Sequence, residues 1–584
     1  MPAPGVDAGP PTWLLAGALF LVLFAVYTVN FRLRGAGDSI PTRRIPFSLL
    51  REGDLDLNEF TWEPTARGTL PYYVHGHDGQ IDAVSTVASG VVVTPLYVLP
   101  AWWLARHDVS YDDVRARVVE VVMERIAAAT LTALSAVVLL IVLRRLTTWR
   151  WAIGLALLYG LGTSAWSISS QALWPHALAQ LTLALLCLLL LAPAPTRLGI
   201  VAAGLVAAVS VANRPQTIAL AGLAFGFVAL HHRRWLAYFA TTPLLVGAAI
   251  AAYNYRIFNT ALGGYGSLSH FDGPLLEGVS GLLVSPNRGL LVFTPIMAFA
   301  LWGAVRVWRI PAPPWLRWLS VAVLAHVLIH GLFKEWWAGY TYGPRYLCDV
   351  LPALTIFLVY GLVPLCRARA VAALAAVLAL YGVAVQAIGA YAADDAWNRE
   401  PTPLELDPGR VWNWGDLQIA RSARNGLHPF ELRRVVTDAF DDPGGTTLAA
   451  LAPPQLAGAI RAVDLPAALP PGATREVGIE IRNVGDAGWA AFNGDGVISA
   501  RHLVFLMVRW YAGGQPLAEA GDVVPLPENV APGEAIAMRW PLQSPARAGD
   551  YELELRVTQA VDGRRGVIGP DALRVPVRID PALR

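Results

Sequence analysis

The chain has 584 residues, of which 55% are hydrophobic and only 15% are charged, whereas a soluble globular protein carries about 25% charged residues. This composition favours an integral membrane protein. The formal net charge is only +2 and the sequence has no basic cluster or nucleic-acid motif, so nucleic acid is excluded as a partner. The three cysteines lie in or beside apolar runs, which argues against a disulfide framework or a thiolate metal cluster.

Apolar runs of about 17 to 25 residues, each long enough for one helical crossing, recur along the chain. The first run lacks the basic leader and small-residue cleavage site of a signal peptide, so we interpret it as a membrane span. We predict about eleven spans in total, at residues 13–31, 120–143, 151–168, 174–192, 198–213, 215–230, 235–253, 289–308, 315–333, 347–365 and 369–391.

A twelfth apolar stretch, residues 84–104, contains Pro95 and Pro100 and fits either a crossing or a segment on the membrane surface. Basic residues near helix ends are retained in the cytoplasm. The short arginine-rich loops fall on one face, which must be cytoplasmic, in either case, but a crossing would move the amino terminus outside. We prefer the topology in which this stretch does not cross. On that topology the first outer loop, residues 32–119, and everything after Tyr391 lie outside the cytoplasm.

The composition becomes that of a soluble protein after residue 395. A proline-rich linker at 396–455 precedes alternating polar and apolar segments, which are separated by glycine and proline turns. We therefore predict a membrane domain at 1–395 and a small extracytoplasmic β-sandwich at 456–584.

Asp38 follows the first span by a few residues. A carboxylate there can accept a proton from a hydroxyl, and the nearby Arg43 and Arg44 can bind a phosphate leaving group. A solvated loop residue or a helix cap explains Asp38 equally simply from its chemistry alone. The run from His75 to Asp78 can supply metal ligands, but a solvated turn is the simpler explanation.

Basic residues also lie at the outer ends of the predicted helices. Arg214 is the most informative, because an arginine at membrane depth needs a polar cavity or a partner; extension of the side chain to the surface is an equal alternative. An interfacial aromatic belt explains the tryptophans and tyrosines but not the basic residues, which a phosphate or diphosphate would need. The other arginines of this set are Arg256, Arg288 and Arg345, and we expect His176, Trp336, Trp337 and Tyr346 to line the same pocket.

Several short motifs occur in a suggestive order. They are Gly37-Asp38-Ser39, Thr94-Pro95-Leu96-Tyr97, Leu161-Gly162-Thr163-Ser164 with Trp174-Pro175-His176, Ser285-Pro286-Asn287-Arg288-Gly289-Leu290-Leu291, and Trp337-Ala338-Gly339 with Gly343-Pro344-Arg345-Tyr346. Together they resemble the GT-C superfamily of polytopic glycosyltransferases, which includes protein O-mannosyltransferases, aminoarabinose transferases and arabinosyltransferases. The resemblance covers roughly residues 13–392. The C-terminal region resembles bacterial immunoglobulin-like domains.

The resemblance implies a polyprenyl-phosphate sugar as donor, with Asp38 as general base on the extracytoplasmic face. The chain lacks the adjacent acid pair often found after the first helix in such enzymes, so Asp54 and Asp56 remain alternatives to Asp38. Metal use varies across the superfamily, and the sequence supports neither a divalent metal nor any other cofactor.

We therefore expect a multi-pass plasma-membrane glycosyltransferase that moves a sugar to a glycan, lipid or protein acceptor by inverting displacement. Two other functions remain open. A lipid or glycan transporter or flippase would explain the many helices, and a non-catalytic envelope scaffold would explain the sandwich. The expected substrate-binding residues are Arg43, Arg44, His176, Arg214, Arg256, Arg288, Trp336, Trp337, Arg345 and Tyr346.

Overall fold

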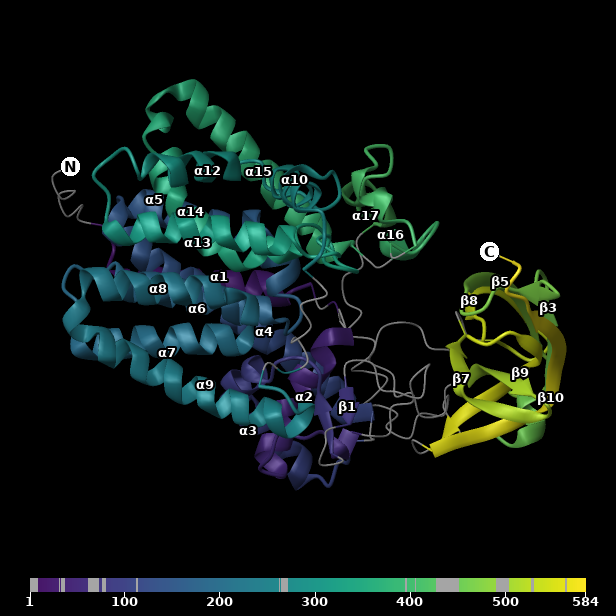
Figure 1. Ribbon diagram of the computed structural model, residues 1–584. Helices are drawn as coiled ribbons and strands as arrows, with labels where there is room; N and C mark the ends of the chain where they lie inside the picture. Colours follow the sequence, from purple (N-terminus) through teal and green to yellow (C-terminus); the bar gives the residue numbers. More distant parts are fainter. Residues whose placement is uncertain are drawn as a thin grey trace.

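The computed structural model describes residues 9–30, 32, 37–60, 73–75, 80–111, 114–261, 263, 271–393, 396–404, 406–426, 451–489, 504–526, 530–561 and 564–583. Figure 1 shows a helical unit, coloured purple to green, followed by a C-terminal β unit in yellow-green and yellow. This confirms a largely helical chain with a β region at its C-terminal end.

Helices make up the first unit. Their bounds are α1 (Thr12–Thr28), α2 (Ile40–Arg51), α3 (Ala88–Arg106), α4 (Val114–Leu146), α5 (Trp149–Gly162), α6 (Pro175–Leu190), α7 (Arg197–Asn213), α8 (Ile218–His231), α9 (Leu236–Phe258), α10 (Leu275–Val284), α11 (Leu290–Phe293), α12 (Met297–Arg306), α13 (Pro314–Gly331), α14 (Leu351–Gly361), α15 (Arg369–Tyr391), α16 (Ala396–Arg399) and α17 (Gln418–Asn425). Two short strands, β1 (Tyr73–His75) and β2 (Ile81–Ala83), pair between α2 and α3.

Four helices in the described part of the chain are long and apolar enough to cross a membrane: Ala88–Arg106, Arg115–Leu146, Arg233–Phe258 and Arg369–Tyr391. Six further apolar helices are only 10–17 residues long. The predicted count of about eleven spans is therefore not supported.

Breaks in the backbone explain part of the difference between the two counts. The apolar run 289–308, for example, is divided between α11 and α12 by a turn that contains Pro295, since proline lacks the N–H that a continuous helix would use. By contrast, α3 continues through Pro95 and Pro100 and meets the length and apolarity criterion. Its expected place on the membrane surface remains a prediction.

The helices pack closely where small residues meet. α4 packs against α1, α5 and α6, while α12 packs against α14 and α7 against α9. At the α12–α14 crossing, a Cβ on Gly303 would lie 2.0 Å from the Phe357 carbonyl oxygen, and one on Gly361 would lie 1.8 Å from that of Phe299. Only glycine fits at either position, as is common where apolar helices cross closely.

The β unit contains two sheets that share one core. Their strand orders are β4-β10-β9-β6-β7 and β3-β5-β8. Alternate side chains of β5, including Ile479 and Ile481, are buried in one cluster with Trp510 and Leu555 of the other sheet. A burial period of two residues is expected of a strand with one buried face. The strand bounds are β3 (Gly458–Ala462), β4 (Ala468–Leu469), β5 (Thr474–Asn483), β6 (Val504–Ala512), β7 (Gln515–Pro525), β8 (Ala535–Gln543), β9 (Gly549–Val561) and β10 (Arg564–Ile579).

Candidate functional site

Asp38 lies in a 3-10 turn, Gly37–Ser39, immediately before α2. Both of its carboxylate oxygens have partners. The Trp174 indole N–H donates to Oδ1 at 2.7 Å, and the Arg345 guanidinium donates to Oδ2. Desolvation acts to raise the pKa of Asp38, but Arg345, Trp174 and the nearby His176 together hold this pKa below its usual value. Asp38 is therefore a carboxylate at neutral pH.

Arg345 connects Asp38 to a histidine. Its guanidinium lies over the Trp174 ring, 4.8 Å from the ring centroid, and its Nε–H donates to His176 Nε2 at 3.1 Å. His176 is the second residue of α6, and Pro175 at the first helical position fixes the start of that helix. His176 Nδ1 lies 2.7 Å from Asp349 Oδ1.

Asp349 connects this histidine to a second arginine. It lies in the 3-10 turn Arg345–Val350, one turn beyond Arg345, and its Oδ2 pairs with Arg214 Nε. Arg214 has an extended backbone, with φ −151° and ψ 96°, because the residue before a proline disfavours the helical region. This break between α7 and α8 turns the guanidinium toward Asp349.

Arg214 also contacts α13 and an aromatic ring. Its Nη2 lies 3.2 Å from His330 Nε2. His330 Nδ1 lies 2.9 Å from the His326 carbonyl oxygen, to which it donates, so Nε2 accepts from Arg214. The guanidinium carbon of Arg214 lies 5.7 Å from the Tyr346 ring centroid.

These contacts form one continuous chain of side chains, hereafter the Asp38 network: Asp38, Arg345, His176, Asp349, Arg214 and His330. Asp38 and Arg345 have the most exposed side chains of the network, at 32% and 15%, while every other member is 10% exposed or less. A ligand would therefore reach the network from the Asp38 end.

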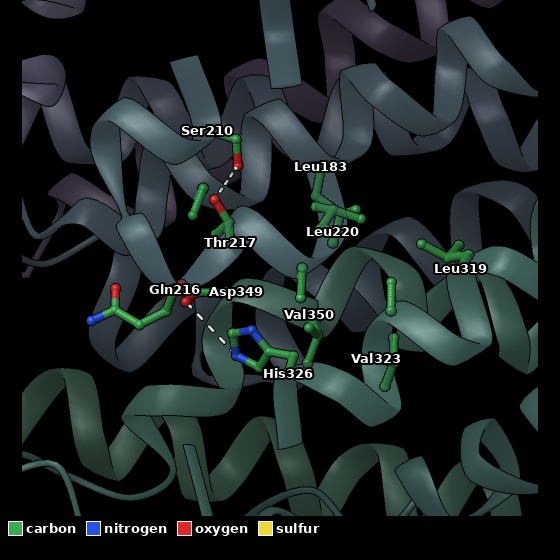
Figure 2. Close-up of a pocket in the computed structure, with 13 residues that line it drawn as sticks. Leu183, Ser210, Gln216, Thr217, Leu220, Leu319, Val323, His326, Asp349 and Val350 are labelled. Atoms are coloured by element: carbon green, nitrogen blue, oxygen red, sulfur yellow. Dashed lines mark hydrogen bonds and ion pairs between the residues drawn. The ribbon is translucent and has the colours of Figure 1, made fainter. Parts of the chain in front are cut away.

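A small cavity borders the buried end of the network. Figure 2 shows Asp349 and His326 beside it, with Gln216 and the hydrogen-bonded pair Ser210 and Thr217. The cavity measures about 20 Å³, which is room for about one water molecule.

The residues at this end do not fit a metal ion, although His326, His330 and Asp349 could each bring a ligand atom within 4.8 Å of the others. Arg214 contacts two of the three groups, Asp349 and His330. His326 Nε2 lies 2.9 Å from the Tyr346 carbonyl oxygen and donates to it. The guanidinium already supplies the positive charge beside Asp349 and His330, so a divalent cation would meet repulsion there. His77 and Asp78, the other metal candidates, lie outside the described residues.

Arg43 and Arg44 lie in a separate buried cluster. Arg43 pairs with Glu124 at 2.9 Å and Arg44 with Glu120 at 3.1 Å, and both acids belong to α4. The Ser39 hydroxyl donates to Glu124 at 2.5 Å. This cluster ties α2 and the turn that carries Asp38 to α4, so the two arginines have a structural role.

Arg288 is also a structural residue. All five of its N–H donors are used, and every acceptor is neutral. Burial, with Arg410 nearby, lowers the pKa of Arg288 to about 9, which leaves it charged at neutral pH. The acceptors are the carbonyl oxygens of Asn287, Trp337 and Gly339 and the side-chain oxygens of Gln418 and Asn398.

The remaining predicted residues lie apart from the network. Arg256 is exposed in the last turn of α9, while Trp336 is buried and packs on Gly281 of α10. Trp337 packs against Trp336, with ring centroids 6.0 Å apart. Five predicted residues lie in or against the network, namely Asp38, His176, Arg214, Arg345 and Tyr346.

Sequence reasoning missed Asp349, His326 and His330. Asp349 lies inside the predicted span 347–365, and an ionisable residue in an apolar span is by default a functional candidate. The two histidines are four residues apart in α13 and so share one face of that helix. Both signals were available in the sequence.

A larger apolar cavity, of about 710 Å³, lies between α7, α8, α9 and the start of α3. Its lining is mostly apolar and includes Ala212 and Pro215, which lie on either side of the Asn213-Arg214 pair. Asn213 is itself held by the hydroxyls of Thr86 and Ser89, each at 2.6 Å. The apolar cavity and the Asp38 network thus meet at one short segment of backbone.

Comparison with known proteins gives no family assignment. No family model matches the chain, and no curated protein matches it. The CARDB domain of a Pyrococcus furiosus protein is 15% identical over 22% of this chain and 99% of that domain, with a TM-score of 0.14. The Pseudomonas fluorescens alkylpurine DNA glycosylase AlkC, bound to DNA with an abasic site analog, is 11% identical over 77% of this chain and 97% of its own, with a TM-score of 0.17. At these TM-scores neither likeness supports a statement about fold or function.

Proposed function

We propose that this chain is a GT-C-like integral membrane glycosyltransferase of the plasma membrane, which moves a sugar from a polyprenyl-phosphate carrier to an extracytoplasmic acceptor. The observation that carries the proposal is a carboxylate, Asp38, at the accessible end of a buried network that contains two arginines. The adjoining apolar cavity supports a donor with a lipid chain. The acceptor class, whether glycan, lipid or protein, is part of what the experiment below must determine.

The proposed reaction is a single inverting displacement. An acceptor hydroxyl gives its proton to Asp38 while its oxygen forms the new bond to the anomeric carbon. The bond from that carbon to the carrier phosphate breaks, and the phosphate leaves with the electron pair. A guanidinium matches a phosphate with two parallel hydrogen bonds, which suits Arg345 and Arg214 to hold the leaving group.

One rearrangement follows from the observed contacts. Asp38 Oδ2 is engaged by Arg345 and Oδ1 by Trp174, and both contacts lower the basicity of the carboxylate that must take the proton of the hydroxyl. A phosphate that attracts Arg345 would free Oδ2 for the hydroxyl. Donor binding would thus prepare the base for the acceptor.

The apolar cavity by itself also fits a protein that moves a lipid without changing its chemistry. A lipid transporter is therefore the second candidate. The two functions differ in one outcome, since transfer breaks the bond between sugar and phosphate and transport leaves it intact.

The test uses the purified full chain in lipid nanodiscs with a panel of radiolabelled polyprenyl-phosphate sugars, and measures release of the labelled sugar from its carrier. Asp38→Asn should lower the rate by about 10²–10⁴-fold, the usual contribution of a general base. Asp272→Asn is the matched control, because Asp272 is an exposed aspartate outside the network. Wild-type turnover by Asp38→Asn would refute the base assignment, and movement of intact labelled lipid across a liposome membrane would select the transporter.

A further inference from the structure

We propose that Asp349 is a positioning residue, which sets the tautomer of His176 and through it the placement of Arg345 against Asp38. The kinetic consequence of this inference rests on the proposed function, whereas its structural content does not. Asp349 is 3% exposed and uses one carboxylate oxygen for His176 and the other for Arg214. It therefore connects His176, Arg345 and Asp38 on one side to Arg214 and His330 on the other.

The first step concerns the proton on His176. A carboxylate only accepts hydrogen bonds, and the guanidinium of Arg345 only donates them. Asp349 at Nδ1 and Arg345 at Nε2 thus require the neutral ring to carry its proton on Nδ1.

The second step concerns Arg345. Its Nε–H donates to the unprotonated Nε2 of His176, while its Nη2 donates to Asp38. One planar group makes both contacts, so a change at His176 changes the angle at which the guanidinium meets Asp38. Asp349 reaches Asp38 only through these two side chains.

The third step predicts what an amide at position 349 would do. An asparagine has one oxygen acceptor and one NH₂ donor. The charged Arg214 is the stronger donor and takes the oxygen, so the NH₂ group faces His176 Nδ1. His176 must then move its proton to Nε2, where it opposes the Nε–H of Arg345, and two donors cannot share a hydrogen bond.

The experiment is a ¹⁵N spectrum of the full chain, labelled at histidine and held in nanodiscs, which distinguishes protonated from unprotonated ring nitrogens. The chain has 11 histidines, so the His176 signals are assigned by their loss in His176→Gln. The wild type should carry its proton on Nδ1, and Asp349→Asn should carry it on Nε2. A wild-type ring protonated on Nε2, or an unchanged tautomer in Asp349→Asn, would overturn the proposal.

A second variant removes the reason for the switch. In Asp349→Asn combined with Arg214→Met, nothing draws the amide oxygen away from His176, so the proton should return to Nδ1. General disruption of the fold would not be reversed by a second substitution. Failure of the double variant to restore the wild-type tautomer would contradict the mechanism.

The pH dependence of kcat/KM reports the pKa of Asp38. The groups that face Asp38 are Arg345, Trp174 and His176, with the Tyr346 phenol also within electrostatic reach. With Arg345 displaced, the pKa of Asp38 should rise, and the acid limb of the kcat/KM profile of Asp349→Asn should move to higher pH. A lower rate with an unmoved acid limb would indicate a merely structural role. If the wild type transfers no sugar, the proposed function fails, and the histidine spectra still decide the role of Asp349.

Discussion

Replacing Arg288 by methionine should destabilise the helical unit more than any change at an exposed arginine. Methionine has a similar length but no donors, and Arg288 is 1% exposed. The substitution would leave five acceptor oxygens without their shared partner. Those oxygens belong to the loop before α11, the loop after α13, and the segment 396–425, so three parts of the chain lose one common contact.

The magnitude follows from the hydrogen-bond count. A hydrogen bond from a charged donor contributes about 1.5–3 kcal/mol, so simple addition of five gives about 7–15 kcal/mol, as much as the whole stability of a typical domain. Addition overcounts, because the bonds share one side chain and are coupled. Gln418 Oε1 also keeps a second donor, the Gly343 N–H at 3.1 Å. We expect about 3–5 kcal/mol, because each buried acceptor left without a donor costs about 1–3 kcal/mol and these coupled losses add only in part.

Thermal unfolding of the purified full chain measures the effect, with Arg424→Met as the matched control, since Arg424 is exposed in α17. Limited trypsin digestion is the second readout, and the Arg288 variant should be cleaved faster after Arg399. A melting midpoint equal to that of Arg424→Met would refute the reasoning, because it would mean that the five contacts contribute nothing.

Three further predictions concern other parts of the helical unit. Glu124→Gln removes one of the two carboxylates that face the buried Arg43, while Glu120 remains 3.5 Å away, and should cost about 1.5–3 kcal/mol in thermal unfolding; a loss below 1 kcal/mol would show that the Glu124 charge is dispensable. Gly361→Ala places a Cβ 1.8 Å from the Phe299 carbonyl oxygen and should lower the free energy of unfolding by at least the ~1–3 kcal/mol of an overpacked core. An unchanged melting midpoint would contradict this. Burial raises the pKa of Glu59 to about 7, so the fold binds this proton more tightly than the unfolded chain does and loses stability as pH rises from 4.5 to 7. Glu59→Gln should therefore melt above wild type at pH 8, with the gap closing toward pH 4, and a gap that does not depend on pH would rule this out.

The sequence located the polar network only in part. Asp38, His176 and Arg345 could be found because each lies at the end of an apolar run, where polar residues stand out. Asp349 could be found only by treating a charge inside an apolar run as a signal, since hydropathy averages conceal it. Arg288 and Arg345 looked alike, as arginines beside a proline or glycine at an outer helix end, yet one is surrounded by neutral oxygens and the other faces a carboxylate.

Those partners explain why the sequence could not separate the two arginines. The Asn398 and Gln418 oxygens that bind Arg288 lie 110 and 130 residues away, so no local pattern contains them.

The number of predicted membrane spans is limited by the same lack of local information. Pro295 coincides with a break between helices, whereas Pro95 and Pro100 lie within a continuous one, and only the packing of neighbouring helices decides which outcome occurs.

The separation in sequence within the Asp38 network has a consequence for biosynthesis. Trp174 follows Asp38 by 136 residues and Arg345 by 307, and a chain is made from its N-terminus onward. Asp38 and Arg214 are therefore synthesised well before the turn Arg345–Val350, which supplies their opposite charges. A chain that stops before this turn contains Asp38 but cannot form its ion pair with Arg345. The complete network therefore forms only after most of the helical unit has been synthesised.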